Sequence, residues 1–150
     1  MKKGIQSLDE LKRAIEDALD GILETNVTAA VRETELKKIE ENVYSVYSPN
    51  VYERRESRGG LGDGDNIKGS ASKGTLTVVN TTPPNPNARD GATTDKNLIE
   101  VIETGHGYDY DNPGPRPFIE PTIKALIDSK ACQKALVEGL ANRGFKVVMK

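Results

Sequence analysis

The chain has 150 residues, 35% of them hydrophobic and 29% charged, and a formal net charge of −2 at pH 7. A chain of this length is most often one domain, which buries about 70% of its unfolded surface on folding. It has no cluster of Lys and Arg of the kind that neutralises phosphates, and no apolar run near the ~20 residues of a membrane span. The composition therefore argues against a nucleic-acid-binding protein and against a membrane-spanning one.

The charge is distributed in blocks along the chain. Lys and Arg counted against Asp and Glu give −3 for residues 1–42, +1 for 43–75, −3 for 76–118 and +3 for 119–150. Such blocks suit contacts between copies, although solvated helix faces produce the same pattern. The single cysteine, Cys132, excludes an internal disulfide, and its place in a helical apolar pattern indicates a core position. The first residues lack the apolar stretch of a signal peptide, so we expect a soluble protein made in a reducing cytoplasm.

Residues 1–47 are predicted to be helical. Ser7-Leu8-Asp9-Glu10 matches a capping box, in which the Ser7 hydroxyl accepts from the Glu10 N–H and the Glu10 carboxylate reaches back. The Thr-rich stretch 25–34 predicts a bend or a weak point in one long helix. Two apolar sets with a helical period flank that stretch: Leu8, Leu11, Ile15, Leu19, Ile22 and Val27, then Leu36, Ile39, Val43 and Val46.

Residues 48–93 are predicted to hold glycine- and proline-rich loops and one β-hairpin. Pro49 disfavours helical geometry in the residue before it and so ends the first helix. The segments 66–72 and 75–80 are predicted to pair as antiparallel strands that turn at Ser72-Lys73-Gly74. The loops at 56–74 and 81–93 are long for a compact domain, so we expect them to become ordered on assembly.

Residues 94–150 are predicted to hold a short helix, a docking loop, a long helix and a terminal strand. Thr94 can cap the short helix, which ends at Gly105. A turn-rich, acidic stretch follows and runs through Arg116-Pro117-Phe118 into the long helix, traced by Ile119, Ile123, Leu126, Ile127, Leu136 and Leu140. Pro121 is tolerated in the first turn of that helix, and Gly144 can terminate it. FKVVMK (145–150) is predicted to be a strand.

This order predicts a single α+β domain over residues 1–150. A long N-terminal helix and a second long C-terminal helix would pack on a small antiparallel β-sheet, with long loops between them.

The sequence gives little support for a metal-binding site. His106 is the only histidine, and Asp109 and Asp111 lie close behind it, with Asp63 and Asp65 as further possible oxygen ligands. The spacing does not match a calcium loop, because the segment from Asp63 departs from the pattern at its fifth position and has no Gly at the sixth. We therefore favour solvated carboxylates over a metal site.

Other catalytic patterns fail in similar ways. Nothing couples His106 to Cys132 as a base to a nucleophile. Hydrolysis by two carboxylates stays open, although the aromatics that line a sugar cleft are few. The GGLGDG stretch (59–64) lacks the Gly-Lys-Ser/Thr of a phosphate loop, so we interpret it as a flexible loop. We expect no enzyme activity and no cofactor.

Arginines and tyrosines are the candidate interaction residues. Arg54-Arg55 can grip an acidic partner, because the planar guanidinium binds carboxylates bidentately, or it can be an exposed pair in a loop. We interpret the acidic half of the docking loop, with Tyr108 and Tyr110, as a solvated loop that meets a neighbouring subunit. Phe118 is the expected anchor into the core under the sheet, and Arg116 beside it is expected to pair with Glu103 or with a neighbour's carboxylate.

Several of these stretches together resemble a known family. They are similar to stretches of the tail-completion, or head–tail joining, proteins of long-tailed bacteriophages. The stretches are NVYSVYSPNVYERR (42–55), GGLGD, the strand TLTVVN, LIEVIETG and RPFIEPTIKAL (116–126). In that family a Glu-x-Gly element precedes a Pro-Phe pair that leads into the next helix. Here these elements are Glu103-Thr104-Gly105 and Pro117-Phe118. The resemblance covers most of the chain from about Asn42 to Leu126.

The resemblance implies a structural protein at the neck or the head-proximal end of the tail. Such proteins usually form a ring of six copies that joins or closes the tail tube, contacts the tube, the sheath or adjacent neck proteins, and leaves a channel for DNA. The location implied is the virion or a tail-like particle, assembled in the host cytoplasm. The usual Pro-x-x-Thr-Gly-x-Leu stretch is replaced here by residues 49–55 and a later Gly-Gly-Leu, which leaves the neck layer open. The alternatives are another small phage assembly factor, such as a tail chaperone or a capsid-associated protein, and a metal-dependent hydrolase.

Overall fold

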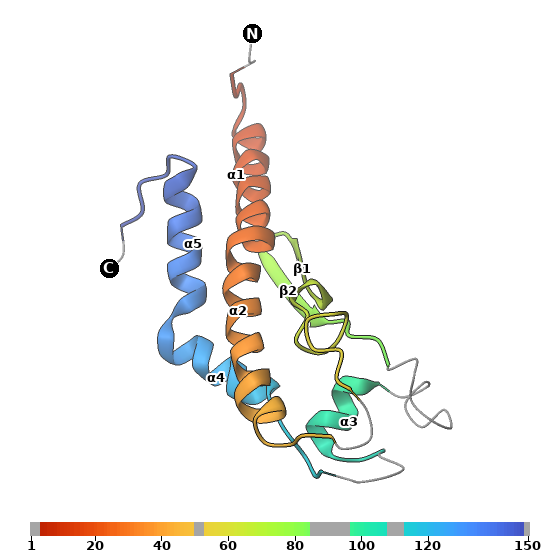
Figure 1. The fold of residues 1–150 in the computed structure, drawn as a ribbon. Coiled ribbons are helices and arrows are strands. Elements are labelled where there is room, and N and C mark those ends of the chain that lie inside the picture. The colour runs from red at the N-terminus through yellow and green to blue at the C-terminus, as the bar shows by residue number, and fades with distance from the viewer. Residues whose placement is uncertain (1–3, 50–52, 85–96, 108–112, 149–150) are drawn as a thin grey trace.

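A long helix is the axis of the molecule (Figure 1). The computed structural model describes residues 4–49, 53–84, 97–107 and 113–148. The helix has 37 residues and is made of α1 (Leu8–Ile22), η1 (Leu23–Val27), α2 (Thr28–Ile39) and η2 (Glu40–Tyr44). Together with a two-stranded antiparallel sheet and three C-terminal helices it confirms the predicted α+β class.

The start of the long helix follows its sequence signal. The Ser7 hydroxyl accepts from the Glu10 N–H at 3.1 Å, and the Glu10 carboxylate accepts from the Gln6 N–H at 2.8 Å. The predicted weak point coincides with η1, a π-helical turn, where the Thr28 hydroxyl donates to the Leu23 carbonyl five residues back. The helix widens there without breaking.

The hairpin consists of β1 (Ile67–Ser72) and β2 (Thr75–Asn80), entered through the 3₁₀ turn η3 (Gly64–Asn66). Lys73 and Gly74 form its two-residue turn, and both have positive φ, 52° and 77°. Two positive φ values are typical of a type I′ turn, whose twist matches that of the paired strands. The predicted hairpin and its turn are confirmed.

A polar stripe on the long helix holds the hairpin in place. The Asp20 carboxylate accepts from the N–H groups of Lys73 and Gly74 at 2.9 and 2.7 Å, and the Glu24 carboxylate accepts from the Ala71 N–H at 2.8 Å. The Arg32 guanidinium donates to the Ile67 carbonyl at 3.0 Å. Because side chains four residues apart lie on one helix face, these contacts form a single line. The hairpin is thus ordered in the subunit, and the expectation that residues 56–74 wait for assembly is wrong.

The C-terminal part contains α3 (Leu98–Thr104), α4 (Ile119–Ser129) and α5 (Ala131–Asn142). α3 begins after Asn97, whose side chain accepts from the Ile99 N–H, while the expected cap Thr94 lies outside the described residues. The expected single long helix is divided at Lys130, which has φ 55° in the left-handed region and turns the chain between α4 and α5. Both helices pack on the long helix, α4 against α2 and α5 against η1.

The predicted terminal strand is wrong for the residues that the structure describes. Gly144, at φ 86°, ends α5 by donating to the Ala141 carbonyl, and the Phe145 N–H donates to the Leu140 carbonyl at 3.0 Å. This Schellman motif directs the chain away from the helix axis. Residues 145–148 then belong to no strand, because no described strand lies beside them.

The apolar core lies at the lower end of the long helix in Figure 1. It joins the end of the long helix to α3, to the start of α4 and to the glycine-rich loop, and its buried members are Ile39, Val43, Leu61, Ile102 and Phe118. Leu61 belongs to the GGLGDG stretch, so that loop is packed and the flexible interpretation is wrong. Its glycines are needed for packing, because a Cβ at Gly60 would lie 2.6 Å from the Glu56 backbone nitrogen.

Candidate functional site: the Arg-Pro-Phe segment and the exposed apolar surfaces

The entry into α4 is fixed by Glu103, at the end of α3. Its Oε1 atom accepts from the backbone N–H groups of Phe118 and Ile119, both at 2.8 Å. Phe118 is the N-cap residue of α4 and offers no side-chain cap of its own. Glu103 therefore caps α4 from 15 residues upstream, and its negative charge lies at the positive end of the helix dipole.

Gly105 joins α3 to the segment that returns to α4. It ends α3 at φ 70° and donates to the Val101 carbonyl at 3.0 Å. A Cβ at this position would lie 2.5 Å from the Pro115 nitrogen and 2.6 Å from the Gly114 carbonyl carbon. Glycine is thus required both for the backbone conformation and for the close approach of the returning chain.

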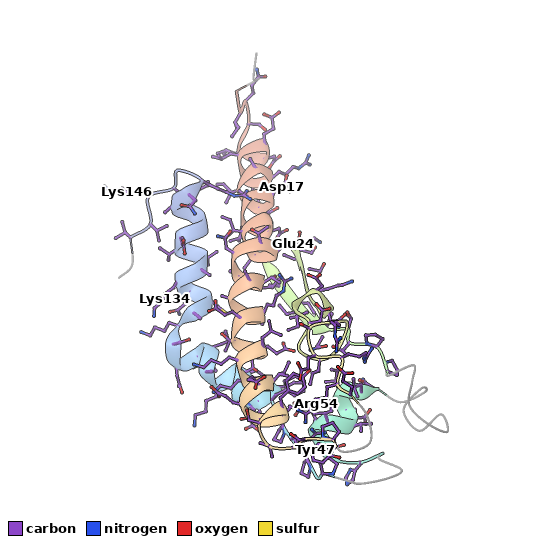
Figure 2. All side chains as sticks on the ribbon, in the orientation of Figure 1. Asp17, Glu24, Tyr47, Arg54, Lys134 and Lys146 are labelled. Atoms are coloured by element: carbon purple, nitrogen blue, oxygen red, sulfur yellow. The ribbon has the colours of Figure 1, made fainter. Side chains whose placement is uncertain are left out.

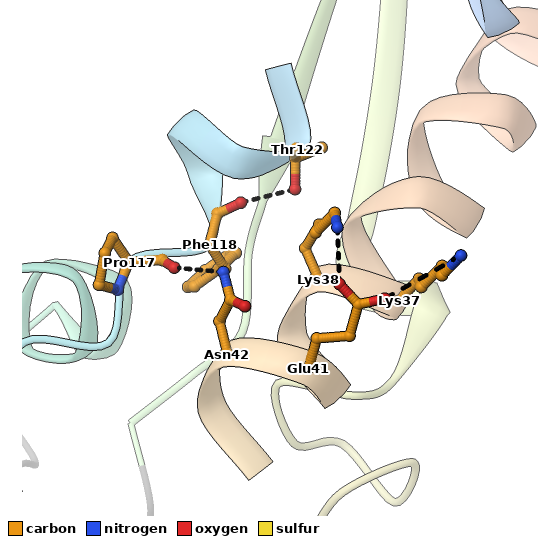
Figure 3. Close-up of polar contacts among 7 residues, drawn as sticks. All are labelled: Lys37, Lys38, Glu41, Asn42, Pro117, Phe118 and Thr122. Atoms are coloured by element: carbon orange, nitrogen blue, oxygen red, sulfur yellow. Dashed lines mark hydrogen bonds and ion pairs between the residues drawn. The ribbon is translucent and has the colours of Figure 1, made fainter. Parts of the chain in front are cut away.

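Phe118 and Pro117 attach the segment to the long helix (Figure 3). The Phe118 side chain is fully buried in the core between α3 and the long helix, not under the hairpin. The Asn42 side-chain amide donates to the Pro117 carbonyl at 3.0 Å, and the Thr122 hydroxyl donates to the Phe118 carbonyl at 2.6 Å. The two carbonyls that enter α4 therefore both accept side-chain hydrogen bonds.

Glu41 lies one residue before Asn42 and belongs to a separate, solvated ion pair. Figure 3 shows its contacts with Lys38 at 2.6 Å and with Lys37 at 4.0 Å. The hydrogen bond from Lys38 lowers the pKa of the Glu41 carboxyl. Exposed pairs of this kind contribute little to stability, so the attachment of α4 depends on Glu103, the buried Phe118 and the Asn42 amide rather than on this pair.

Arg116 is buried, which corrects the expectation that it is available to a neighbour. Only 5% of its surface is exposed. Its guanidinium lies 5.1 Å from the centre of the Tyr47 ring, and its Nη1 is 3.5 Å from the Val43 carbonyl oxygen. Glu103, its expected partner, uses Oε1 for the backbone of α4 instead. Arg116 thus belongs to the packing under the end of the long helix.

Arg54 lies near two tyrosine rings at the end of the long helix, Tyr44 and Tyr47. Figure 2 labels Arg54 and Tyr47 at that end. The Arg54 guanidinium carbon lies 4.9 Å from the centre of the Tyr44 ring and 5.9 Å from that of Tyr47, a cation–π arrangement. Its Nη1 donates to the Tyr44 carbonyl at 3.0 Å. The Tyr44 hydroxyl in turn accepts from the Gly62 N–H at 2.8 Å, and burial raises the pKa of that hydroxyl.

The other candidate interaction residues divide into two groups. Arg55 donates to the Pro83 carbonyl at 2.6 Å and so connects two loops within the subunit. Tyr108 and Tyr110 lie outside the described residues. The described arginines of the candidate interface therefore all have partners inside their own subunit.

Sequence reasoning missed the two tyrosines and the polar stripe. Tyr44 and Tyr47 are three residues apart, a spacing that places them near each other at the end of a helix. The stripe had a clearer signal, because Asp20, Glu24, Thr28 and Arg32 recur every four residues. A charged line of this kind is usually solvated, so only the position of the hairpin shows its role.

Two exposed apolar surfaces are the main candidates for interaction. The first, which we call the α1 face, consists of Leu8, Leu11 and Ile15, with exposed fractions of 84%, 41% and 47%. The second, the α4 stripe, consists of Ile119, Ile123 and Ile127, with exposed fractions of 42%, 53% and 69%. The α1 face lies on the same helix side as Ile22, which is fully buried where Gly139 of α5 contacts it. It therefore continues the contact line of α1 and α5 beyond the end of α5.

Of the residues considered for metal binding and nucleophilic chemistry, Asp109 and Asp111 lie outside the described residues. The Asp63 carboxylate accepts from the Gly59 and Asp65 N–H groups and so closes its own loop. In the described part of the chain no three His, Cys, Asp or Glu side chains are grouped so that they could hold a metal ion. Cys132 is partly buried in α5, and this burial raises the pKa of its thiol. None of the described helices is long and apolar enough to cross a membrane.

The comparisons with known proteins give one match. The model of the YomN family matches residues 7–142, so the chain belongs to this family. YomN itself is a protein of a Bacillus prophage region. Searches of curated proteins and of solved structures found no match to the chain.

Proposed function

From membership of a prophage-associated family we propose that the protein is a structural component of a phage or phage-derived tail. It forms a ring, of six copies, at the neck or the head-proximal end of the tail. The ring joins or closes the tail tube around a DNA channel and contacts the tube, the sheath or an adjacent neck protein. Such a subunit needs no catalytic residue and no cofactor.

The observation that carries this proposal is the α1 face. Its three large aliphatic side chains lie on the side of the helix that, about two turns further on, is buried against α5 at Ile22. Exposed large apolar side chains grouped on one surface mark a site of interaction. Residues 8–22 also carry five carboxylates against Lys12 and Arg13. That excess of negative charge disfavours an anionic membrane surface and favours a protein partner.

The two apolar surfaces suit two different contacts of a ring subunit. The α1 face and the α4 stripe lie near opposite ends of the long helix (Figure 1). A ring is closed by heterologous contacts, in which one patch of a subunit meets a different patch of its neighbour. In our proposal the α1 face contributes to the contact between subunits, and the α4 stripe is available to the adjoining layer of the tail.

The experiment is a measurement of mass in solution with a matched pair of variants. We expect the purified chain to form a hexamer by native mass spectrometry without added metal, and to bind purified tail tubes. The variant Leu11→Gln with Ile15→Gln should lose the hexamer. Arg13 and Asp17 are exposed and lie on the opposite side of the same helix, so Arg13→Gln with Asp17→Gln, which leaves the net charge unchanged, should keep it.

Other outcomes point to other functions. A chain that remains monomeric at high concentration and never binds tubes would contradict the ring. If such a monomer bound unassembled tail proteins, it would be an assembly factor of the chaperone class. Cleavage of DNA that required Mg²⁺ would indicate a hydrolase.

A further inference from the structure

The hairpin has one covered edge and one open edge. In a type I′ hairpin the residues that flank the turn, Ser72 and Thr75, exchange hydrogen bonds, and the alternate pairs do not. The backbone groups of Ala71 and Ile67 therefore point away from β2. Both meet the polar stripe, since Glu24 accepts from the Ala71 N–H and Arg32 donates to the Ile67 carbonyl. The outer edge of β1 is thus covered by the long helix.

The outer edge of β2 has no such cover in the described residues. By the same alternation the N–H and C=O groups of Leu76 and Val78 point away from β1, and no described residue bonds to them. β2 reads TLTVVN, six residues without a charge or a proline. Charges, prolines and bulges are the usual protection of an edge strand, and an edge without them is a template for another strand. A two-stranded sheet is also marginal by itself.

The same chain contains a strand-forming segment without a strand partner. Residues 145–148 read Phe-Lys-Val-Val, a composition that favours strands. They follow the Schellman motif at Gly144 and belong to no helix or strand. Phe145, Val147 and Val148 are 43%, 36% and 74% exposed. The strand predicted here from sequence is absent because the described part of the subunit places no open edge beside it.

We propose that the Phe145–Val148 segment of one copy adds a third strand to the β2 edge of a neighbouring copy. The hairpin and α5 lie on opposite sides of the long helix (Figure 1), and Figure 2 shows Lys146 on the side away from Glu24 and the hairpin. A short segment after α5 therefore cannot reach its own hairpin. A donor on one side and an acceptor on the other form a heterologous contact, the type of contact from which closed rings are built. The inference rests on the proposed function and specifies its subunit contact.

The side chains of both segments fit this pairing. Alternation along a strand places Phe145 and Val147 on one face and Lys146 on the other. On β2 the half-buried side chains are Leu76, Val78 and Asn80, which face inward and alternate with exposed side chains such as Thr77. The added strand can lay Phe145 and Val147 beside the inward face of β2 and leave Lys146 beside Thr77 in water.

Two variants test the donor and the acceptor separately. Val78→Pro removes an N–H that points away from β1, so it costs no hydrogen bond within the hairpin. Deletion of residues 145–150 removes the donor and leaves the hairpin untouched. We expect each variant alone to be monomeric by native mass spectrometry. Mixed together they should form a one-to-one dimer, because the first retains a donor and the second retains an acceptor.

The control and the readouts separate this inference from the proposed function. Thr77→Val changes a solvent-facing side chain but no outward backbone group, so it should keep the parent's hexamer. In the hexamer, hydrogen exchange at the Leu76 and Val78 amides should slow at least tenfold relative to the deletion variant. If the deletion variant forms the parent's ring, or if the mixture stays monomeric while the parent assembles, the inference is overturned and the ring remains. If the parent itself stays monomeric, the ring is overturned as well.

Discussion

Removal of the Glu103 carboxylate should detach the start of α4 from α3. Glu103→Ala deletes the acceptor of two backbone N–H groups, both at 2.8 Å, at a helix end that has no other side-chain cap. Loss of a cap costs about 0.5–2 kcal/mol, and hydrogen bonds to a charged group are worth about 1.5–3 kcal/mol each. Glu103 is half-buried and Ile119 is exposed, so water replaces part of the loss. We therefore expect the free energy of unfolding to fall by about 2 kcal/mol.

Urea denaturation measures this change, and two variants calibrate it. Glu103→Gln keeps an acceptor oxygen but loses the charge, so its loss should be about 1 kcal/mol. Glu100 is exposed on the same helix, and Glu100→Ala should change stability by less than about 0.5 kcal/mol. For a domain of this size the melting temperature of Glu103→Ala should fall by about 4–8 °C. A Glu103→Ala protein as stable as Glu100→Ala would refute the assignment of Glu103 as the cap of α4.

Three further changes test the packing and the buried charge. Phe118→Ala truncates a fully buried side chain of the core and should cost about 3–5 kcal/mol in urea denaturation, whereas a loss below 1 kcal/mol would show that the site is not packed. Gly69→Ala places a Cβ against the Thr28 side chain and should destabilise the hairpin by about 1–3 kcal/mol; combination with Thr28→Ala should recover part of the loss, and a purely additive double variant would contradict that contact. Burial raises the pKa of Glu35, whose carboxylate accepts from the Asn80 amide at 2.7 Å, so ionisation of Glu35 opposes folding. The free energy of unfolding of Glu35→Gln should therefore exceed that of the parent by most at pH 7. As the pH falls through the raised pKa, Glu35 becomes protonated and the parent gains stability, so this difference should shrink. A difference that is independent of pH would refute the buried charge.

The parts of the fold that sequence predicted correctly are those encoded by neighbouring residues. The Ser7 cap and the antiparallel hairpin that turns at Ser72-Lys73-Gly74 each depend on residues within a few positions of one another. The glycine at 105 was expected to end a helix and does so at φ 70°. Local chemistry of this kind can be read without knowledge of the tertiary structure.

The errors arose where the partner lies far away in the sequence. Sequence predicts that three arginines are available to bind a neighbouring subunit: Arg54, Arg55 and Arg116. Each instead has a carbonyl or aromatic partner in its own subunit, between 7 and 73 residues away in the sequence. The apolar period that continues from α4 into α5 gave no sign of the turn at Lys130, because helical residues flank it on both sides. A periodic pattern also identifies the apolar face of a helix but not the residues that cover it. Ile123 belongs to such a pattern, and its side chain is 53% exposed.

The long helix has a polar face that packs inside the subunit and an apolar face that is exposed. Its polar stripe is turned inward to bond the hairpin, while the α1 face is left outside. Full burial of a Leu or Ile side chain yields about 1.5–3 kcal/mol, and each member of the α1 face is already partly covered, so the face can supply about 3–5 kcal/mol. A micromolar contact requires about 8 kcal/mol after the cost of association is met. In the proposed ring the α1 face is therefore too small to hold two subunits by itself, and the strand added to β2 is the second contact of that proposal.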